Sequence, residues 1–237
     1  MGDSTVCEYD TNTCTSLNRY GWGMKLADCY NNVTVKNLAL SGRSSRSFLT
    51  ESNYQTLVNS ISKGDYLFIQ FGHNDEKTDE STYAGLGTYP SLDMSTLDSE
   101  GKNNLNQYSY EWILLNKYIK VAQNKGAVPV LITPITRRNA DGTANYQQHP
   151  PYQQALINLG KENNVAVIDM TALTTKLYTN LYDYGGASET AKLHCYSDTA
   201  QTTIDNTHLS NAGAVKIASM IAEQTKNLNL TISDNLK

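Results

Sequence analysis

Short apolar runs rich in β-branched residues alternate along the chain with stretches whose apolar positions recur at helical spacing. This alternation is typical of an α/β fold in which helices cover a parallel sheet. The apolar runs predict strands at Val33–Leu38, Tyr66–Phe71, Ala127–Ile132 and Val165–Ile168. The helical stretches predict helices near Trp22–Tyr30, Tyr54–Ile61, Tyr108–Asn124, Tyr152–Glu162 and Asn211–Lys226. We therefore expect a three-layer α/β/α fold with a central parallel sheet.

Two of the predicted helices carry a clear apolar face. In the helix near Tyr108–Asn124 the residues that share this face are Trp112, Leu115, Ile119 and Ala122. In the last predicted helix they are Ala212, Val215, Ala218, Ile221 and Ala222. Because these positions recur at the period of an α-helix, we expect both faces to pack against the core.

Polar residues follow the predicted strands at the point where each strand ends. Ser41-Gly42-Arg43 follows the first strand, Gly72-His73-Asn74 the second, and Arg137-Arg138 comes shortly after the third. In an open α/β sheet, ligands bind beyond the carboxyl ends of the strands. The sequence therefore predicts a site at this edge. The long polar segment Thr78–Asn104 leaves the sheet here, and we expect it to wall the cleft.

The size and charge of the chain narrow the possible partners. At 237 residues without an internal repeat or linker, residues 1–237 are expected to form a single domain. The net charge of −4 argues against nucleic acid, since phosphate binding needs a basic face. No apolar run is long enough to span a bilayer. We expect a monomer that binds neither nucleic acid nor membrane.

The chain has four cysteines: Cys7, Cys14, Cys29 and Cys195. None forms a CxxC pair, which argues against a zinc site. Cys7 and Cys14 bracket a short polar loop, so they either close it as a disulfide or remain free thiols; both alternatives stay open. The 16 tyrosines and the many Asn, Ser and Thr residues favour an extracellular protein.

Three residues far apart in the sequence have the chemistry of a catalytic triad. Asp205 and His208 are three positions apart just before the last predicted helix, so the carboxylate can hold Nδ1–H of the imidazole. Nε2 is then free to face a serine hydroxyl, and Ser4 is the candidate nucleophile. The alternative is that Asp205 caps a turn and His208 is a surface histidine.

Two further positions are candidate donors to an oxyanion. Asn74 follows an apolar strand, from which its amide group could project into the site. Gly42 lacks a Cβ, so its backbone N–H could approach a ligand closely. Taken alone, each of them is an ordinary turn or loop residue. Their order along one predicted edge favours the functional interpretation.

These residues together resemble a known family. Gly2-Asp3-Ser4, Gly42, Gly72-His73-Asn74-Asp75 and Asp205-x-x-His208 resemble the four motif blocks of the GDSL/SGNH hydrolases. The stretches that resemble its rhamnogalacturonan acetylesterase branch are Ser41–Phe48, the predicted strand running into Gly72–Glu76, Thr133–Arg138 and Asp205–His208. The G-x-S-x-G motif of α/β-hydrolases is absent, because Val6 stands where its second glycine belongs.

The resemblance implies a fold, a mechanism and a set of roles. The fold would be the flavodoxin-like SGNH fold. Ser4 would be the nucleophile, His208 the base and Asp205 the acid that orients it. The oxyanion hole would consist of the Ser4 and Gly42 N–H groups and the Asn74 side chain. The enzyme would be a carboxylic-ester hydrolase that needs no metal or organic cofactor.

The resemblance also implies a secreted carbohydrate esterase that removes O-acetyl groups from a pectic polysaccharide containing galacturonate. Guanidinium groups bind carboxylates bidentately, which makes four arginines candidates for binding it: Arg43, Arg46, Arg137 and Arg138. Internal ion pairs are the alternative for each. Other candidates for the cleft are His149 and His194, and for stacking on sugars Tyr83, Tyr89 and Tyr152. For these residues a structural role is the alternative.

One feature departs from the family. A buried strand normally leads into Gly-Asp-Ser, whereas only Met1 precedes Gly2 here. We expect this strand to be absent or supplied from elsewhere, and Leu228–Ile232, with its apolar alternation, is the candidate. The rival functions are the same chemistry on acetylated xylan, a lipid or a thioester, and a non-catalytic relative that binds glycans.

Overall fold

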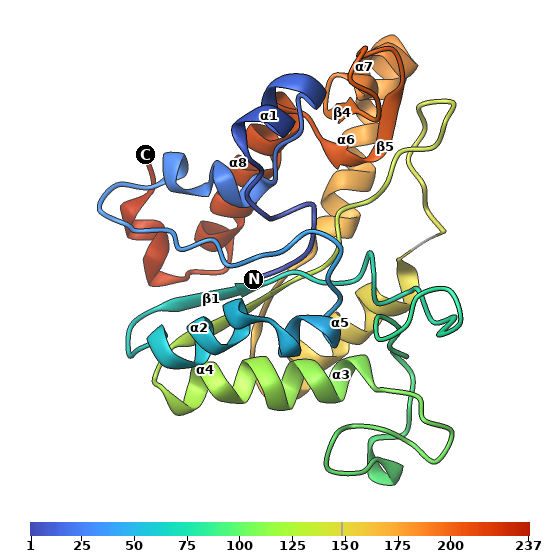
Figure 1. The fold of residues 1–237 in the computed structure, drawn as a ribbon. Helices are drawn as coiled ribbons and strands as arrows, with labels where there is room; N and C mark the ends of the chain where they lie inside the picture. The colour runs from blue at the N-terminus through green and yellow to red at the C-terminus, as the bar shows by residue number, and fades with distance from the viewer. Residues whose placement is uncertain (148) are drawn as a thin grey trace. The chain divides into compact units, whose positions relative to one another are not determined.

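The computed structural model describes residues 1–147 and 149–237, and the chain separates into two compact units (Figure 1). Unit 1 consists of Met1–Asp3, Gly42–Pro134 and His149–Asp169. Unit 2 consists of Ser4–Ser41, Ile135–Gln148 and Met170–Lys237. Each unit has its own sheet and helices. The single catalytic domain expected from the sequence stays a prediction.

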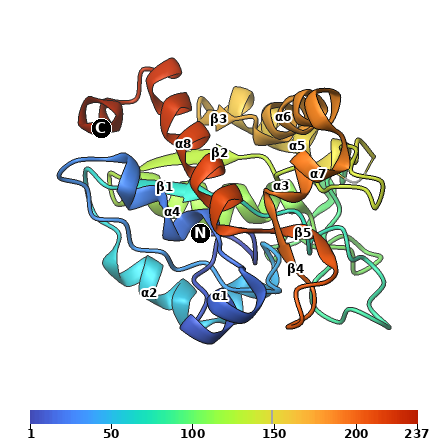
Figure 2. The ribbon, with the colours of Figure 1, turned by 90° about the horizontal axis from the view of Figure 1, so that it is seen from above.

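Unit 1 contains a parallel sheet whose strands lie side by side in the order β1-β2-β3 (Figure 2). The strands are β1 (Tyr66–Ile69), β2 (Val128–Ile132) and β3 (Ala166–Ile168). Val130 lies between Phe68 and Ala166 in the register. Most strand residues are apolar and buried, as expected for a sheet covered by helices. The predicted α/β class and three of the predicted strands are therefore confirmed.

The first residues of the chain lie against β1. Gly2 forms a parallel bridge with Gln70, and the amino group of Met1 donates a hydrogen bond to the carbonyl oxygen of Phe68 at 2.8 Å. The N–H of Gln70 in turn donates to the carbonyl oxygen of Met1 at 3.0 Å. These bonds fix Met1 and Gly2 just before the Asp3-Ser4 step.

The helices of unit 1 lie on one side of the sheet (Figure 1). They are α2 (Ser52–Ser60), α3 (Tyr110–Ile113), the π-helical segment η5 (Leu114–Ile119), α4 (Lys120–Asn124) and α5 (Pro150–Asn163), with short 3₁₀ turns η3 (Ser47–Thr50) and η4 (Met94–Thr96). Segments α3, η5 and α4 follow one another directly. The helices predicted near these positions are confirmed.

The buried face of this long helix differs from the predicted one. Its buried residues are Tyr110, Ile113, Leu114, Tyr118, Ile119 and Ala122. Trp112 and Leu115, which the helical period places on the core face, are only half-buried. The wider turn of the π-helical segment changes the angle between successive residues, so a strict α-helical period assigns the wrong face.

Unit 2 combines helices with one β-hairpin. Its helices are α1 (Thr11–Leu17), α6 (Met170–Gly185), α7 (Ala187–Ala191) and α8 (Asn211–Asn227), with 3₁₀ turns η1 (Trp22–Met24), η2 (Leu26–Cys29) and η6 (Thr231–Asn235). The antiparallel hairpin consists of β4 (His194–Tyr196) and β5 (Ile204–Leu209). No helix in the part of the chain that the structure describes is both long and apolar enough to cross a membrane.

Helix α8 confirms the last predicted helix but buries a different face. The buried positions include Ala214, Ile217, Ala218, Ile221 and Ala222, whereas Val215 is 49 % exposed. Ala212 is exposed as well. The apolar face is therefore rotated by about one position from the predicted one at the start of the helix.

The predicted helix at Trp22–Tyr30 is wrong, because two 3₁₀ turns occupy this stretch. The N–H groups of Trp22 and Gly23 donate to the carbonyl oxygens of Thr5 and Val6, at 2.9 and 3.2 Å. These contacts tie the start of the stretch to the N-terminal segment. A Cβ at Gly21 would lie 2.1 Å from the carbonyl oxygen of Cys7, so only glycine permits this approach.

Two predicted strands are also wrong. The structure assigns no strand to Val33–Leu38, where the Asn37 side chain donates to the Val6 carbonyl oxygen at 2.8 Å and accepts from the Ala39 N–H at 3.2 Å. Leu228–Ile232 is no strand either. Asn229, with a φ of 54°, ends α8 in the left-handed conformation, and η6 follows. This segment therefore does not supply the strand expected before Gly2.

A buried carboxylate joins the loops of unit 1. Asp75 is fully buried and accepts hydrogen bonds from the Ser45 N–H and hydroxyl and from the Thr88 hydroxyl. Burial raises the pKa of Asp75 to about 7, although these hydrogen bonds act in the opposite direction. Asp75 therefore exchanges a proton near neutral pH.

The stability of the protein should fall as pH rises from about 4 to about 7, and level off above that pH. Folded Asp75 keeps its proton up to that pH, whereas an unfolded aspartate loses it near about 3.9, so ionisation of the buried group disfavours the folded state. The effect is at most about 4 kcal/mol, at about 1.4 kcal/mol for each pH unit between the two pKa values. Urea unfolding at pH 5 and 8.5 should show a smaller pH dependence in Asp75→Asn. The exposed Asp183→Asn is the control, and equal pH dependence in all three proteins would contradict the prediction.

Candidate active site

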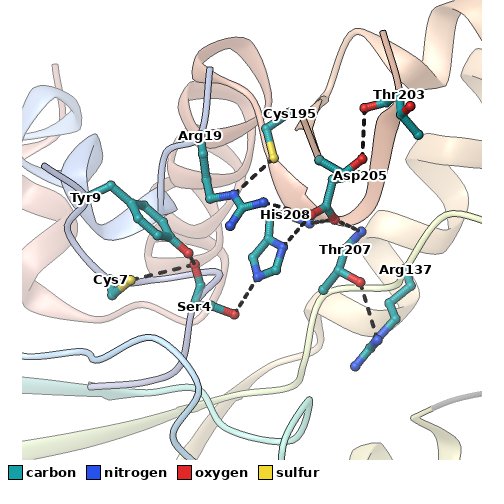
Figure 3. A network of polar contacts seen from close by, with 11 residues as sticks. Ser4, Cys7, Tyr9, Arg19, Arg137, Cys195, Thr203, Asp205, Thr207 and His208 are labelled. Carbon is teal, nitrogen blue, oxygen red and sulfur yellow. Dashed lines mark hydrogen bonds and ion pairs between the residues drawn. The ribbon is translucent and has the colours of Figure 1, made fainter. Parts of the chain in front are cut away.

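Ser4, His208 and Asp205 form a hydrogen-bonded chain within unit 2 (Figure 3). Ser4 Oγ lies 2.9 Å from His208 Nε2, and His208 Nδ1 lies 2.8 Å from Asp205 Oδ2. When Nδ1 carries the proton, Nε2 is free to accept the proton of the Ser4 hydroxyl. The geometry is that of a nucleophile, a general base and an orienting acid.

The turn that carries Ser4 is fixed by contacts of its backbone. The Tyr9 hydroxyl donates to the carbonyl oxygen of Ser4 at 2.8 Å, and the Cys7 thiol lies 3.8 Å from the same oxygen. The next two carbonyl groups accept the hydrogen bonds from Trp22 and Gly23 described above. Ser4 itself is buried, with 7 % of its surface exposed. Its hydroxyl group therefore has little freedom to move away from His208.

The hairpin strand β5 and the start of α8 position Asp205 and His208. Asp205 Oδ1 accepts hydrogen bonds from the N–H groups of Thr207 and His208, at 2.7 and 2.9 Å. Asp205 thus binds the backbone of β5 with one carboxylate oxygen and orients the imidazole with the other. Ser210 follows directly and caps α8, since its hydroxyl oxygen accepts from the Gly213 N–H at 3.1 Å.

Asp205 is an anion in this environment. Burial by itself raises its pKa, but the hydrogen bonds from the His208 side chain and from the two backbone N–H groups outweigh burial. Together they hold the pKa of Asp205 well below its usual range. A negative charge beside His208 stabilises the imidazolium that forms when the base takes a proton.

Arg19 is a residue of the site that the sequence patterns did not indicate. Its Nη2 lies 3.0 Å from Asp205 Oδ2, and its Nε donates to Cys195 Sγ at 3.3 Å (Figure 3). The arginine stands in the loop after α1, far from Asp205 in the sequence. No local motif connects the two residues, so only the tertiary structure identifies the pair.

The predicted oxyanion donors Gly42 and Asn74 belong to unit 1, whereas Ser4 belongs to unit 2. Gly42 has a φ of 75° and no atom within 4 Å of its missing Cβ, so its backbone is open to a ligand. The Asn74 side chain donates to the Arg43 carbonyl oxygen at 3.0 Å and accepts from Lys77 at 2.8 Å. Their assignment to an oxyanion hole stays a prediction.

Three of the candidate arginines have partners inside their own unit. Arg43 Nε lies 2.7 Å from Glu51 Oε1, and Arg46 pairs with Glu80 and stacks 3.8 Å above the Tyr108 ring. Arg138 is buried and donates to Asn206 Oδ1 at 2.8 Å, to Thr190 Oγ1 at 3.1 Å and to the Ala187 carbonyl oxygen at 3.2 Å. These contacts favour the internal alternative, most strongly for Arg138.

Arg137 lies next to the triad. Its Nη1 donates to Thr207 Oγ1 at 3.3 Å, and Thr207 directly precedes His208 (Figure 3). Arg137 and Arg138 thus each bind a residue that is adjacent in the sequence to a member of the triad, Thr207 and Asn206.

The other candidates for the cleft are mostly buried. His149 Nδ1 lies 3.1 Å from Glu76 Oε2, and the His149 ring contacts His73 at 4.5 Å. His194 packs against Tyr178 at 5.4 Å, and burial lowers its pKa to about 4, so it is neutral near pH 7. These contacts favour the structural alternative for both histidines.

The candidate tyrosines differ in exposure. Tyr152 is buried and its hydroxyl donates to the carbonyl oxygens of Thr88 and Asp75, so it supports the loops of unit 1. Tyr89 is half-buried, and Tyr83 is 42 % exposed and faces the Lys77 ammonium group. Of these three, Tyr83 is the ring with the most open surface.

Unit 2 also has a pocket of about 440 Å³. Its lining residues are Asn139, Ala144, Asn145, Tyr146 and Gln147. Tyr146 is 58 % exposed, and its hydroxyl forms a hydrogen bond with Thr179 Oγ1 at 2.8 Å, which ties the ring to α6. The sequence analysis did not indicate this pocket, because amides in a loop give no periodic signal.

All four cysteines are free thiols in this structure, Cys7 and Cys14 included. Within the described residues, no cluster of three or more His, Cys, Asp or Glu side chains could hold a metal ion.

The sequence profile of the GDSL-like Lipase/Acylhydrolase family matches residues 1–215. The chain belongs to this family. Membership places it among the carboxylic-ester hydrolases. It is 32 % identical to the rhamnogalacturonan acetylesterase RhgT of Bacillus subtilis (strain 168), over 99 % of this chain and 91 % of the relative.

Solved structures show the same fold. The crystal structure of the Bacillus subtilis protein YxiM matches with a TM-score of 0.69 at 22 % identity, covering 97 % of this chain and 56 % of that chain. Axe2, an acetylxylan esterase from Geobacillus stearothermophilus, matches with a TM-score of 0.56 at 18 % identity, over 94 % of this chain and 90 % of that chain. At these identities the likeness establishes the fold of the GDSL hydrolases and nothing further.

Replacing Arg138 should destabilise the protein without weakening substrate binding. We expect Arg138→Met to lower the free energy of unfolding by about 2–4 kcal/mol, because one buried and two partly buried acceptors lose their charged donor. Chemical denaturation measures this loss, and the exposed Lys176→Met is the control. Unchanged stability together with a raised KM would instead support the substrate-binding role predicted from the sequence.

Proposed function

We propose that the protein is a serine carbohydrate esterase that removes O-acetyl groups from a pectic polysaccharide of the rhamnogalacturonan type. The observation that carries this proposal is the hydrogen-bonded chain from Ser4 through His208 to Asp205. Membership of the family supports the reaction, and the similarity to RhgT along nearly the whole chain supports the substrate class. A secreted role in pectin degradation is part of the same proposal.

The proposed reaction has two steps. His208 takes the proton from Ser4 as Oγ attacks the acetyl carbonyl carbon, and the same proton then passes to the departing sugar hydroxyl. The acetyl group remains on Ser4 as an ester. A water molecule, deprotonated by His208, attacks this ester; acetate leaves, and the serine regains its proton. Asp205 remains ionised throughout and stabilises the imidazolium.

Donors to the oxyanion complete the proposed mechanism. By the family resemblance they are the N–H groups of Ser4 and Gly42 and the side-chain amide of Asn74. Each such donor typically contributes about 10²–10³ in kcat, because it is aimed at charge that develops only in the transition state.

Two features of unit 2 support a glycan as substrate. Arg137 lies beside the triad, where a guanidinium group can bind the carboxylate of a galacturonate residue. The pocket beside Tyr146 offers amide groups that both donate and accept hydrogen bonds, together with an exposed ring that can cover the apolar face of a sugar. We propose this pocket as a binding subsite for the polysaccharide.

An acetylated xylan is the alternative substrate, because the fold is shared with the acetylxylan esterase Axe2. Acetylated xylan and the proposed pectic substrate require the same attack by serine. They differ in charge, since galacturonate carries a carboxylate. A direct comparison of the two polysaccharides therefore separates them.

Acetate release should depend on Ser4 and favour the pectic substrate. We expect the wild type to release acetate from acetylated rhamnogalacturonan faster than from acetylated xylan. Ser4→Ala should lower release by about 10⁴-fold or more, because the nucleophile is lost while the fold is kept. Acetate measured enzymatically over time, with circular dichroism of both proteins, tests this. Serine-dependent release from xylan alone would overturn the substrate, and release by Ser4→Ala at the wild-type rate would overturn the mechanism.

Removing the exposed ring of the pocket should weaken binding of the polymer only. Tyr146→Ala should raise KM for acetylated rhamnogalacturonan by about 5–20-fold, the value of one lost aromatic contact, and leave KM for p-nitrophenyl acetate unchanged. The matched control is Tyr184→Ala, which removes another exposed tyrosine of unit 2. If Tyr146→Ala and Tyr184→Ala give the same KM for the polymer, the pocket is not a subsite.

A further inference from the structure

We propose that Arg19 is a positioning residue for the triad, which fixes the Asp205 carboxylate and modulates the charge that Asp205 presents to His208. This inference rests on the proposed esterase function and concerns the same site. It adds a fourth side chain to the arrangement, one that neither touches substrate nor exchanges a proton.

Hydrogen-bond donors surround the carboxylate of Asp205. Oδ2 accepts from Arg19 Nη2 at 3.0 Å and faces His208 Nδ1 at 2.8 Å, while Oδ1 accepts the two backbone N–H groups of the turn. A carboxylate bound on both oxygens has no freedom to rotate. Both side chains of the Arg19–Asp205 pair are largely buried, 19 % and 14 % exposed, so solvent screens the pair less than it screens a surface ion pair.

Arg19 is itself held in place by a buried side chain. Its Nε donates to Sγ of the fully buried Cys195 at 3.3 Å. Burial raises the pKa of the Cys195 thiol to about 11, so at neutral pH the sulfur is a neutral acceptor. The thiol orients the guanidinium group without competing for its charge. That charge therefore acts on Asp205.

A closed ring of contacts connects Arg19 with both ends of the triad (Figure 3). The guanidinium carbon of Arg19 lies 5.9 Å from the centre of the Tyr9 ring, and the Tyr9 hydroxyl donates to the Ser4 carbonyl oxygen at 2.8 Å. The contacts thus run from Ser4 through His208 and Asp205 to Arg19, and back through Tyr9. Arg19 supports the acid end of the triad directly and the nucleophile's turn through Tyr9.

The other titratable and charged groups around the Asp205–His208 pair do not take over this role. They are Cys7 and Tyr9 from the N-terminal segment, His194 and Cys195 from β4, and Arg137 and Arg138 from the segment after β2. Burial keeps Tyr9, His194 and Cys195 uncharged near pH 7, because it raises the pKa of Tyr9 and of Cys195 and lowers the pKa of His194. The two arginines bind Thr207 and Asn206. Arg19 is the cation that bonds Asp205 itself.

A positive charge on Asp205 has a definite consequence for the base. It offsets part of the negative charge that Asp205 presents to the imidazole of His208. Removing the charge should move the acid limb of the pH–rate profile to higher pH. Removing only the planar geometry should lower the rate and leave the limb in place, because Lys keeps the charge but not the fork of donors.

The experiment compares Arg19→Met and Arg19→Lys with the wild type in kcat/KM for p-nitrophenyl acetate between pH 4.5 and 9. For Arg19→Met we expect kcat/KM to fall about 10–100-fold, the value of one hydrogen bond between charged groups, and the acid limb to rise by about 0.5–1 pH unit. For Arg19→Lys we expect a loss below about 10-fold and an unmoved limb. The control is Lys192→Met, which removes an exposed cation paired with Glu189.

The outcomes separate this inference from the proposed function. If Arg19→Met matches Lys192→Met in rate and in pH profile, or loses rate with the acid limb unmoved, the positioning role is overturned. If the wild type shows no Ser4-dependent hydrolysis, the esterase function itself fails. Cys195→Ala is a second variant, useful should Arg19→Met not fold. It frees the guanidinium group from its buried acceptor, and we expect a loss of about 2–5-fold in kcat/KM with the limb in place. Wild-type kinetics in both Arg19→Lys and Cys195→Ala would overturn the proposal.

Discussion

The active site depends on one partly buried anion, the carboxylate of Asp205. An anion removed from water is stable only when charged or polar groups replace its hydration. Here the two backbone N–H groups of the turn, the imidazole of His208 and the guanidinium of Arg19 do so. The same four contacts fix the backbone of β5, orient the base and link the hairpin to the N-terminal segment. The catalytic geometry and the local fold of unit 2 therefore have a common cause.

Asp75 in unit 1 shows what happens to a buried carboxylate without a cation. Its partners are the backbone and hydroxyl of Ser45 and the hydroxyl of Thr88, all of them neutral. Its pKa rises to about 7, whereas that of Asp205 lies well below the usual range. Asp75 is the more deeply buried of the two, and the nearby Asp3 carboxyl group raises its pKa further, whereas the hydrogen bonds from His208 and Thr207 outweigh burial at Asp205. One carboxylate thus serves a fold that tolerates its protonation, and the other serves chemistry that requires its charge.

The parts of the structure that could be predicted from the sequence are those encoded locally. The strands at 66–71, 127–132 and 165–168 are continuous apolar runs, and the sheet confirms them. The triad geometry was predictable because the spacing of Asp205 and His208 permits only a few arrangements beside a serine. The hairpin of β4 and β5 was missed, since its residues are mostly polar and give no apolar run.

The predictions that failed depended on contacts between distant segments. The stretch 22–30 has a helical pattern, but it forms two 3₁₀ turns, and the N–H groups of Trp22 and Gly23 bind the carbonyl groups of Thr5 and Val6. The stretch 33–38 has the composition of a strand, yet Asn37 uses its side chain to bond Val6. Arg19 stands far from Asp205 in the sequence and in no motif. In each case the partner lies in a distant segment of the chain, so the tertiary structure identifies it and a local sequence pattern does not.

The charges of the candidate arginines limit how this esterase can select an acidic polysaccharide. Arg43 and Arg46 form ion pairs with Glu51 and Glu80, and Arg138 donates its hydrogen bonds to internal acceptors. A guanidinium group already paired with a carboxylate gains little from a second one, because it must first give up its partner. For the proposed substrate, the arginine to be tested is therefore Arg137, which donates to Thr207 Oγ1 beside His208. In the same proposal, the uncharged amides and the Tyr146 ring of the pocket would bind the rest of the polymer.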